Sequence, residues 1–335
     1  GESTALTLSI SSPRTPLGRP QLPVVPNIRF DPLQSGAQHI RSGGKREVVH
    51  FFRYRVRSFR EGTHAIPPIE ISAGGVTLRT PELSLEVRPL DSLTWQEATI
   101  AGTKLRYGSA VFHPDRQPFV GETFPAEVKV YVPVESVLSE KGYAELEHDG
   151  LTAWRFEPTG AIGNAALPLG TYSVVTFRSA ASPLRAGEVT LGPGTARMAF
   201  QTRPRSGIGF SFRHVSGSFP VPEVKLTARA LPTGAPPGFN GAVGQFQLAA
   251  SAETDDLEEG DPIAVRLRVK GTGNLDTLKV PDLASKQDQW KAYEASRLER
   301  QGERRSVSGE VSFSQIIRPL TPQTEIPPFR LVSFN

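Results

Sequence analysis

The feature that most constrains the fold of this chain is a short stretch that occurs twice. GTHAIPPIEIS at positions 62–72 returns as QTEIPPFRLVS at positions 323–333. Both follow apolar, aromatic-rich runs, at 51–59 and 311–320. Proline fixes φ, donates no hydrogen bond to a ladder and extends the residue before it, so a proline pair suits the entry of a strand or an edge strand. The stretch therefore predicts a β-unit that is repeated along the chain.

A third copy lies between these two. RAGEVTLGP at 185–193 aligns with REGTHAIPP at 60–68, and TPELSLEVRPL at 80–90 is echoed by VPEVKLTARAL at 221–231. Apolar and polar residues alternate in the last pair, which is the pattern of a strand with one buried face. The sequence thus indicates three related units.

Each unit also begins in the same way, with a glycine, an acidic residue and an alternating strand. These segments are GESTALTLSI at 1–10, GETFPAEVKV at 121–130 and GDPIAVRLRV at 260–269. The alternation predicts that one face of each strand is buried. The residues predicted to face inward are Leu6, Leu8 and Ile10, then Ala126, Val128 and Val130, then Val265, Leu267 and Val269.

The predicted fold class is all-β, with three tandem Ig-like β-sandwich domains. Among 335 residues there are 31 Gly and 30 Pro, which favours short strands joined by turns. We place the domains at 1–93, 94–236 and 237–335, because Pro and Gly crowd a short connection at 231–241. The first copy lacks the strand that precedes the opening turn in the others, and the third stops before a partner for its last strand. We therefore expect a portion of a longer protein, whose first and last domains here each miss a terminal strand.

One segment would be assigned differently without the repeat. Residues 284–305 are rich in helix formers and, taken alone, predict a helix. Their counterpart in the first copy, at 24–46, contains Gly and Pro that exclude a helix. The repeat therefore predicts short strands around Trp290 and Tyr293.

Composition and charge exclude several classes of function. Cysteine is absent, which excludes disulfides, thiolate metal sites and a cysteine nucleophile. Lys and Arg number 38 against 34 Asp and Glu, and this near balance predicts no nucleic-acid partner. The sequence contains no run of 18 apolar residues and no charged-then-apolar leader, so neither a membrane span nor an export signal is expected within it.

Catalytic and cofactor motifs are also absent, so we expect a protein that is not an enzyme and that carries no cofactor or metal. There is no GxSxG elbow, P-loop or Rossmann fingerprint. SGIGFSF at 206–212 has a G-x-G but neither a third glycine nor a following helix. The histidines show neither HxxxH nor HExxH spacing, which argues against zinc ligation. They are His39, His50, His64, His113, His148 and His214.

An acidic run, ETDDLEEGD at 253–261, is the best candidate for a metal site. Clustered carboxylates can hold calcium, but this spacing fits no EF-hand loop. The other copies carry a single acidic residue at the same turn, Glu2 and Glu122. A solvated turn is therefore the favoured interpretation, with calcium binding as the alternative.

The middle unit carries an insertion that we predict to be a protein-contact loop. From Pro68 to Thr80 there are 12 positions and from Pro193 to Val221 there are 28, so 16 residues are added. Arg and aromatic residues are typical of contact patches, and an insertion on a rigid scaffold can present them. The alternative is a hairpin tip without a function. The candidate contact residues are Arg203, Arg205, Phe210, Phe212 and Arg213.

The stretch 231–283 resembles the junction between repeats in the BatD proteins of the bacterial Bat aerotolerance (oxygen tolerance) operons. The opening segment at 1–10 and the strand-then-IPP segments at 51–69 and 313–329 resemble the same family more generically. The residues that carry the resemblance are Leu231, Pro232, Phe239, Gly241, Ala242, Val243, Gly244, Phe246, Gly260, Asp261, Gly273, Asn274, Leu275 and Pro281.

The resemblance implies a location in the periplasm or on the extracytoplasmic face of the membrane. Family members are exported, anchored by a helix after the β-domains, and encoded beside von Willebrand A-domain Bat proteins and a MoxR-type ATPase. These are the partners that the resemblance implies, with membrane contact only through an anchor that this chain lacks. It supplies no catalytic residues.

We therefore expect one function, with a second as the alternative. The first is a non-enzymatic scaffold or protein-interaction module of a BatD-like aerotolerance or envelope-stress complex. The second is a cell-surface array that binds carbohydrate or calcium, which would need an exposed aromatic platform. The tryptophans available for such a platform are Trp95, Trp154 and Trp290.

Overall fold

The computed structural model is almost entirely β-structure, which confirms the predicted fold class. Among the described residues, strands are accompanied by one 3-10 turn, Leu90–Ser92, and by no α-helix. In that part of the chain no helix is long and apolar enough to cross a bilayer. The structure describes residues 2–11, 18–42, 45–58, 60–73, 75–202, 213–252, 260–284, 289–298, 305–323 and 325–335.

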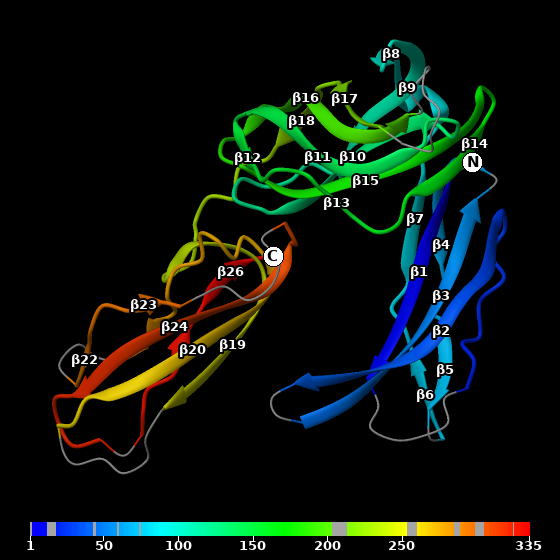
Figure 1. Ribbon diagram of the computed structural model, residues 1–335. Helices are drawn as coiled ribbons and strands as arrows, with labels where there is room; N and C mark the ends of the chain where they lie inside the picture. Colours follow the sequence, from blue (N-terminus) through cyan, green and yellow to red (C-terminus); the bar gives the residue numbers. More distant parts are fainter. Residues whose placement is uncertain are drawn as a thin grey trace.

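The strands form three groups, which we call the N-terminal, middle and C-terminal units (Figure 1). The N-terminal unit has a sheet of order β1-β3-β2 and two small sheets, β4-β7 and β5-β6. Its strands are β1 (Ser3–Ser11), β2 (Ile28–Ser42), β3 (Lys45–Ser58), β4 (Gly62–Ile66), β5 (Glu70–Ala73), β6 (Val76–Arg79) and β7 (Leu83–Val87).

The middle unit is a sandwich of two sheets. One has the order β12-β15-β10-β9-β8, with β13 and β14 also on β15, and the other has the order β11-β16-β17, with β18 on β16. Its strands are β8 (Thr94–Ile100), β9 (Thr103–Phe112), β10 (Phe124–Pro133), β11 (Leu138–Asp149), β12 (Leu151–Ala153), β13 (Glu157–Pro158), β14 (Gly163–Leu167), β15 (Gly170–Pro183), β16 (Gly187–Thr202), β17 (Arg213–Val221) and β18 (Val224–Ala228).

The C-terminal unit has a sheet of order β22-β24-β20-β19-β26, with β23 also on β24, and a small sheet β21-β25. In this unit β26 runs parallel to β19, whereas the other pairs are antiparallel. Its strands are β19 (Phe239–Ala252), β20 (Ile263–Gly273), β21 (Asp282–Leu283), β22 (Trp290–Ala292), β23 (Ser296–Arg297), β24 (Ser308–Pro319), β25 (Phe329–Arg330) and β26 (Val332–Phe334).

The strand registers reproduce the repeat read from the sequence. The first alternating strand of each unit pairs antiparallel with a later strand. In each unit this later strand has a phenylalanine opposite the middle inward residue of the first strand. The three equivalent pairs are Leu8 with Phe52, Val128 with Phe177, and Leu267 with Phe313.

A second pair of strands recurs as well. Gly62 lies opposite Val87 in the N-terminal unit, and Gly187 lies opposite Ala228 in the middle unit. Both glycines have positive φ, at 108° and 95°, which the sequence alignment of these two turns anticipates. The proline pair acts as predicted too, because it ends one residue before β5 in the first copy and lies directly before β25 in the third.

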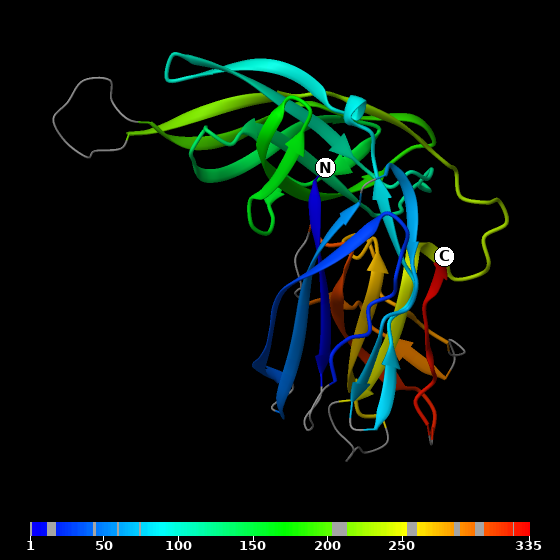
Figure 2. The ribbon, with the colours of Figure 1, turned by 90° about the vertical axis from the view of Figure 1, so that its right-hand side faces the viewer.

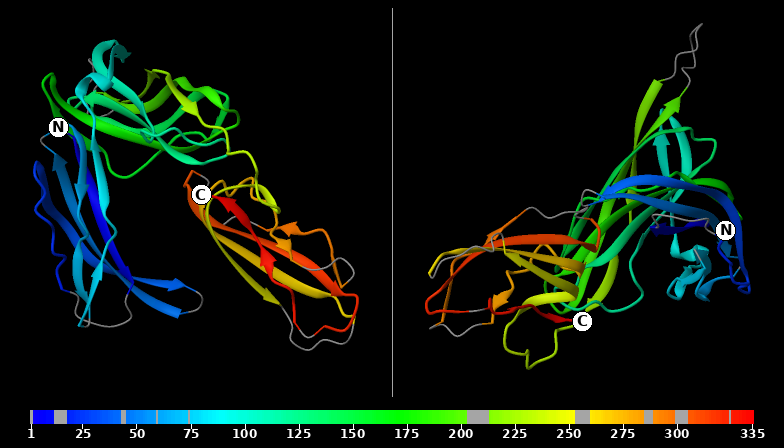
Figure 3. Two further views of the ribbon diagram at one scale, coloured as in Figure 1. Left: turned by 180° about the vertical axis from the view of Figure 1, so that it is seen from behind. Right: turned by 90° about the horizontal axis from the view of Figure 1, so that it is seen from below.

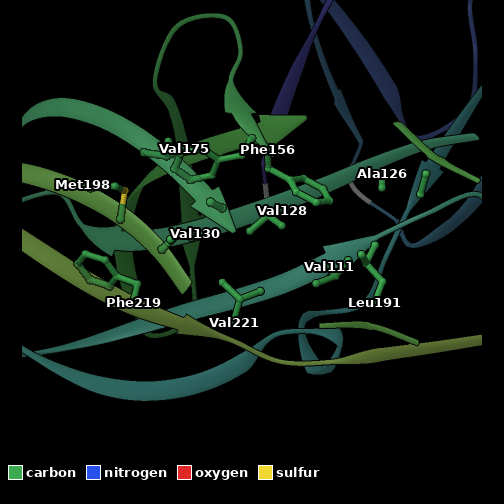
Figure 4. Close-up of a cluster of buried hydrophobic side chains, with 14 of the residues drawn as sticks. Val111, Ala126, Val128, Val130, Phe156, Val175, Leu191, Met198, Phe219 and Val221 are labelled. Carbon is green, nitrogen blue, oxygen red and sulfur yellow. The ribbon is translucent and has the colours of Figure 1, made fainter. Parts of the chain in front are cut away.

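The core of the middle unit lies between its two sheets (Figure 4). Val128 and Val130 project from β10, Phe156 closes the cluster from a connection, and Phe219 and Val221 enter from β17. All of these side chains are buried. This is the layer that the alternation in β10 predicts, since every second residue faces inward.

The segment around Trp290 is extended, which confirms the prediction made from the repeat. Trp290 is buried and begins β22, which pairs with β24. Tyr293 follows this strand directly, and its N–H donates to the carbonyl of Ile316 on β24 at 2.9 Å. The helix that local propensity favours there does not form.

The N-terminal and C-terminal units lie on the same side of the middle unit (Figures 1 and 3). The predicted boundaries fall between strands, since β7 ends at Val87 and β8 begins at Thr94, and β18 ends at Ala228 and β19 begins at Phe239. The division into three domains is compatible with these breaks and stays a prediction.

Candidate functional site

The predicted contact loop belongs to the β16–β17 hairpin. Arg213 is the first residue of β17, is exposed and pairs with Thr202 across the hairpin. The same interval of the N-terminal unit holds the short β5–β6 hairpin, so the 16 added residues make this hairpin longer in the middle unit. The other candidate contact residues, Arg203, Arg205, Phe210 and Phe212, lie outside the described residues.

The stem of this hairpin is fixed by the core beneath it. Phe200 and Phe219 are buried side chains from its two strands, with ring centroids 5.6 Å apart. A Cβ built on Gly217 would lie 2.4 Å from Cδ1 of Ile100, so β17 packs closely against β8 at this point. The outer ends of the two strands project from the middle unit (Figure 2). The stem of the hairpin is thus a well-packed support for the residues that connect β16 to β17.

The acidic run at 253–261 is described only at its end. The carbonyl of Gly260 accepts a hydrogen bond from Nε of Arg318 at 2.8 Å, and Asp261 is exposed. Within the described ranges, no three His, Asp or Glu side chains lie close enough together to hold a metal ion. Residues 253–259 lie outside those ranges, so the calcium alternative for this run stays untested.

The tryptophans do not form a shared platform. Trp95 packs edge-on against Tyr172, with ring centroids 5.2 Å apart, and the Arg106 guanidinium lies over it. Trp290 is buried in the C-terminal unit. Trp154 is 44% exposed, which is the largest exposed fraction of the three side chains. A carbohydrate site that needs several coplanar rings is not favoured by this arrangement.

Three of the six histidines make local contacts with the backbone or with hydroxyl groups. The Nε2 atom of His64 lies 2.9 Å from the carbonyl oxygen of Arg60, and Nδ1 of His113 lies 2.8 Å from that of Pro114. The His214 ring lies 3.1 Å from the Ser139 hydroxyl. These contacts give the three rings positions within their own loops or neighbouring strands.

A feature that the sequence did not indicate lies where the N-terminal and middle units meet. A cavity of about 570 Å³ opens there, between the start of β1, the end of β7 and the outer face of β10. Residues that line it include Glu2, Arg88, Phe112, Lys129 and Tyr131.

Glu2 ties the two units together across this cavity. Its Oε1 lies 2.8 Å from Nζ of Lys129, and its Oε2 accepts a hydrogen bond from the Tyr131 hydroxyl at 2.7 Å. Burial, and then the negative charge of Glu2, raises the pKa of Tyr131 well above its usual value. Tyr131 therefore stays protonated and donates to the carboxylate. The backbone of Glu2 adds a bridge to Ala165 on β14.

Arg88 fixes the connection between the same two units. Its Nε lies 2.8 Å from the carboxylate of Glu86, and its Nη2 donates to the carbonyl of His113 at 2.9 Å. The guanidinium also lies over the Phe112 ring, 5.3 Å from its centroid. Together with Glu2, these contacts give the junction a defined geometry rather than leaving the units joined by a bare linker.

The same repeat position has different partners in the middle unit. Glu122, the counterpart of Glu2, accepts a hydrogen bond from the N–H of Phe119 at 2.9 Å and pairs with Arg116. Burial alone would raise the pKa of Glu122, but Arg116 and the Phe119 N–H hold it below its usual value. The sequence identifies both carboxylates as turn residues, which holds for Glu122. It gives no signal that Glu2 instead reaches another unit.

The chemistry of the junction is that of a structural contact, since its charged groups are paired with one another and with backbone carbonyls. Comparison with known proteins adds no assignment. The sequence matches no protein-family model, and no curated protein is significantly similar to it.

Proposed function

We propose that this chain is a non-enzymatic scaffold that acts by protein–protein contact, as part of an extracytoplasmic complex of the BatD-like type. The observation that carries the proposal is the β16–β17 hairpin. Its stem is anchored by Phe200 and Phe219 in the core, and its outer ends project from the unit. Binding residues placed on a rigid support lose less conformational freedom when a partner docks.

The arrangement of the units supports the same proposal. Related strand pairs recur in register along the chain, which is how arrays of β-units build long surfaces. The ion pair between Glu2 and Lys129 and the contacts of Arg88 join the first two units directly. A scaffold that places two partners relative to one another needs such contacts between its units.

The identity of the partners follows from the resemblance in residues 231–283. The proposed partners are von Willebrand A-domain Bat proteins and, through them, a MoxR-type ATPase. The proposed location is the periplasm or the extracytoplasmic face of the membrane. Arg213, with Arg203 and Arg205 before it, supplies positive charge and planar hydrogen-bond donors at the proposed contact.

The test is affinity capture from an envelope extract of a bacterium that encodes a Bat operon, with the chain as bait. We expect recovery of the A-domain proteins. A variant in which residues 201–218 are replaced by a short glycine-containing turn should lose them, and so should Arg203, Arg205 and Arg213 changed together to Ala. A matched control changes Lys104, an exposed residue of β9, to Ala and should capture normally.

Two results would overturn the proposal. One is that the A-domain proteins are absent from repeated captures although circular dichroism shows the bait folded. The other is equal recovery by the intact chain and by both hairpin variants. Titration of the same preparation with calcium and with cell-wall glycans tests the alternative function. Saturable binding of either ligand would support that alternative.

A further inference from the structure

The outward face of the C-terminal sheet carries a row of positive charge. β20 and β24 run side by side in this sheet (Figure 1), and the exposed residues in the middle of β20 are Arg266, Arg268 and Lys270. Residues two apart on a strand lie about 7 Å apart on one face, so the three cations form a line. The neighbouring strands place small residues beside it, since Arg268 lies between Ser312 of β24 and Ala249 of β19. The cations are therefore open to a partner.

Few negative charges balance this row. Glu310, opposite Lys270, is the one acidic residue of β20 and β24. Arg318 of β24 and Lys291 of β22 lie opposite one another and add positive charge to the same face. Among the residues that the structure describes, no carboxylate lies within ion-pair distance of Arg268 or Lys270. The face is therefore strongly positive, although the chain as a whole is nearly balanced.

Exposed apolar side chains lie beside the row. Ile316 on β24 is 46% exposed, and it is the diagonal neighbour of Arg266 across the strand pair. Tyr293 donates its N–H to the carbonyl of Ile316 at 2.9 Å, and Leu298 donates to that of Ser312 at 2.8 Å. Both residues thus lie opposite outward residues of β24, and both are exposed. Arginine beside exposed aromatic and aliphatic side chains is typical of a protein contact patch.

The same face of the middle unit is already a contact between units. Val128 and Leu267 are equivalent in register, so Lys129 of β10 stands at the position of Arg268. Lys129 is paired with Glu2 of the N-terminal unit at 2.8 Å. The face that receives a carboxylate of a neighbouring unit in the middle unit therefore recurs in the C-terminal unit, where it is more positive.

The open face of the C-terminal unit is not explained by a neighbouring unit that is lacking. In the middle unit, the unit that covers this face is the preceding one. The unit that precedes the C-terminal unit is the middle unit, which contacts β26 instead, through Phe119 and Phe334 with ring centroids 4.8 Å apart. In the N-terminal unit, the unit that follows leaves the same face open, since Arg53 and Arg55 of β3 are exposed.

We propose that this face of β20 and β24 binds an acidic surface of a partner protein, on which carboxylates alternate with apolar side chains. The cations repeat about every 7 Å along β20, and diagonal neighbours such as Arg266 and Ile316 lie about as far apart. This is also the spacing of side chains on one face of an extended strand. The carboxylates pair with the row as Glu2 pairs with Lys129, and the apolar side chains cover Ile316.

A protein fits this face better than a membrane or a simple polyanion does. An anionic polymer without apolar groups would pair with the row but leave Ile316, Tyr293 and Leu298 in water. Proteins that bind at a membrane surface bury apolar groups roughly 5 to 10 Å into the headgroup boundary, which side chains on a flat sheet do not reach. The combination of the two kinds of side chain on a flat surface favours a folded protein with a matching face.

This inference rests on the proposed function in that the partner is a protein, but its test does not use the hairpin. The probe is a short dye-labelled peptide in which Glu and Leu alternate on one face of an extended strand and Thr occupies the other. Its controls have Lys in place of Glu, or Ser in place of Leu. Fluorescence anisotropy measures binding to the full chain. A carbodiimide, which joins carboxylates to amines, locates the bound peptide.

We expect the Glu–Leu peptide to bind about tenfold more tightly than the Lys–Leu peptide, a preference that two exposed ion pairs can supply. The Glu–Ser peptide should also bind more weakly, because it covers no apolar surface. Added salt should weaken the binding of the Glu–Leu peptide, since the pairs are exposed. Carbodiimide should couple this peptide to Lys270.

Matched variants isolate the face. Arg268→Gln combined with Lys270→Gln should weaken binding of the Glu–Leu peptide about tenfold. Arg53→Gln with Arg55→Gln makes the same change of charge on β3 and should leave the binding unchanged. Ile316→Ser should weaken it, whereas Leu33→Ser, at a side chain that is also 46% exposed, should not. All of these residues are exposed, and circular dichroism checks that each variant is folded.

Several outcomes overturn the inference. The Glu–Leu and Lys–Leu peptides bind equally, or the β3 variant loses as much affinity as the β20 variant, or the cross-links avoid Lys270. Binding to phosphatidylglycerol vesicles that needs Arg268 and Lys270, without binding of the peptide, would identify a membrane as the occupant instead. A sedimentation mass that rises with concentration and falls in the β20 variant would identify a second copy.

The two proposals can fail separately. Normal capture of the A-domain proteins by a chain that does not bind the Glu–Leu peptide would overturn this inference and leave the proposed function in place. Hairpin variants that lose those proteins yet still bind the peptide at Lys270 would support the face of β20 and β24 as a second contact surface.

Discussion

Raising the pH should destabilise the middle unit through a buried phenol, Tyr107. This side chain of β9 is fully buried, and its hydroxyl lies 3.0 Å from both Oε1 of Gln96 and the carbonyl oxygen of Pro220 on β17. Its ring packs edge-on against Phe219, with centroids 5.0 Å apart. The hydroxyl therefore connects the two sheets of the sandwich. Burial raises the pKa of Tyr107 from 10.0 to about 12.

The sign and size of the effect follow from linkage. Below pH 10 the phenol is neutral in both states, so its contribution to stability is fully present. Between pH 10 and about 12 the unfolded chain loses the proton and the folded chain keeps it, so the free energy of unfolding falls. At pH 11 the loss amounts to about 1.4 kcal/mol relative to pH 8, the equivalent of one pKa unit.

The comparison that isolates this residue is Tyr107→Phe. At pH 8 we expect the variant to be about 1 kcal/mol less stable, because the hydroxyl's hydrogen bond is lost while Ser109 still donates to the Pro220 carbonyl. At pH 11 the intact chain has lost about 1.4 kcal/mol that the variant has not, so the order of stability should reverse. The other tyrosines titrate in both proteins, so their contributions cancel when the two free energies of unfolding are compared.

The measurement is urea unfolding at pH 8 and pH 11, followed by the fluorescence of Trp95 and Trp154, which both lie in the middle unit. Parallel shifts of the two proteins with pH would refute the reasoning, since they would mean that Tyr107 ionises as easily in the folded state as in the unfolded one. A conformational change is excluded as the cause if the near-ultraviolet spectra of the two proteins agree at pH 8.

Two further predictions concern packing. Phe313→Ala should lower the free energy of unfolding by about 3 to 5 kcal/mol, measured by calorimetry, because this ring is 3% exposed. Phe52→Ala, at the equivalent but half-buried position, should lower it clearly less. Equal losses in the two variants would contradict the thinner core of the N-terminal unit. Gly142→Ala should lower the melting temperature far more than Gly234→Ala, since a Cβ at 142 would lie 2.0 Å from the carbonyl oxygen of Arg197 and one at 234 meets open space. Both glycines have positive φ, so backbone strain alone would make the two variants equally unstable.

The sequence predicts the fold well where the signal is periodic. Alternation identifies the inward faces of β10 and β20, and the repeat aligns Val128 with Leu267 before any coordinates are known. The strands then pair with Phe177 and Phe313 in equivalent registers. The repeat also corrects local propensity at Trp290, because residues in a sheet are governed by the tertiary contacts of their unit rather than by helix preference alone.

The candidate site was less predictable because its contacts join residues far apart in the chain. Glu2 and Lys129 are separated by 127 positions, and each belongs to an alternating pattern that predicts only a solvent-facing residue. Tyr131 likewise lies on the face of β10 opposite to Val130, which a single sandwich would leave in water. The N-terminal unit covers that face, and nothing in either strand's own sequence encodes the docking.

The edge of β1 shows how one pattern can have two outcomes. The alternating strand that opens each unit carries equally apolar inward residues, so alternation by itself predicts equal burial in all three units. Burial is complete only where a neighbouring strand covers the edge, as β9 does for β10.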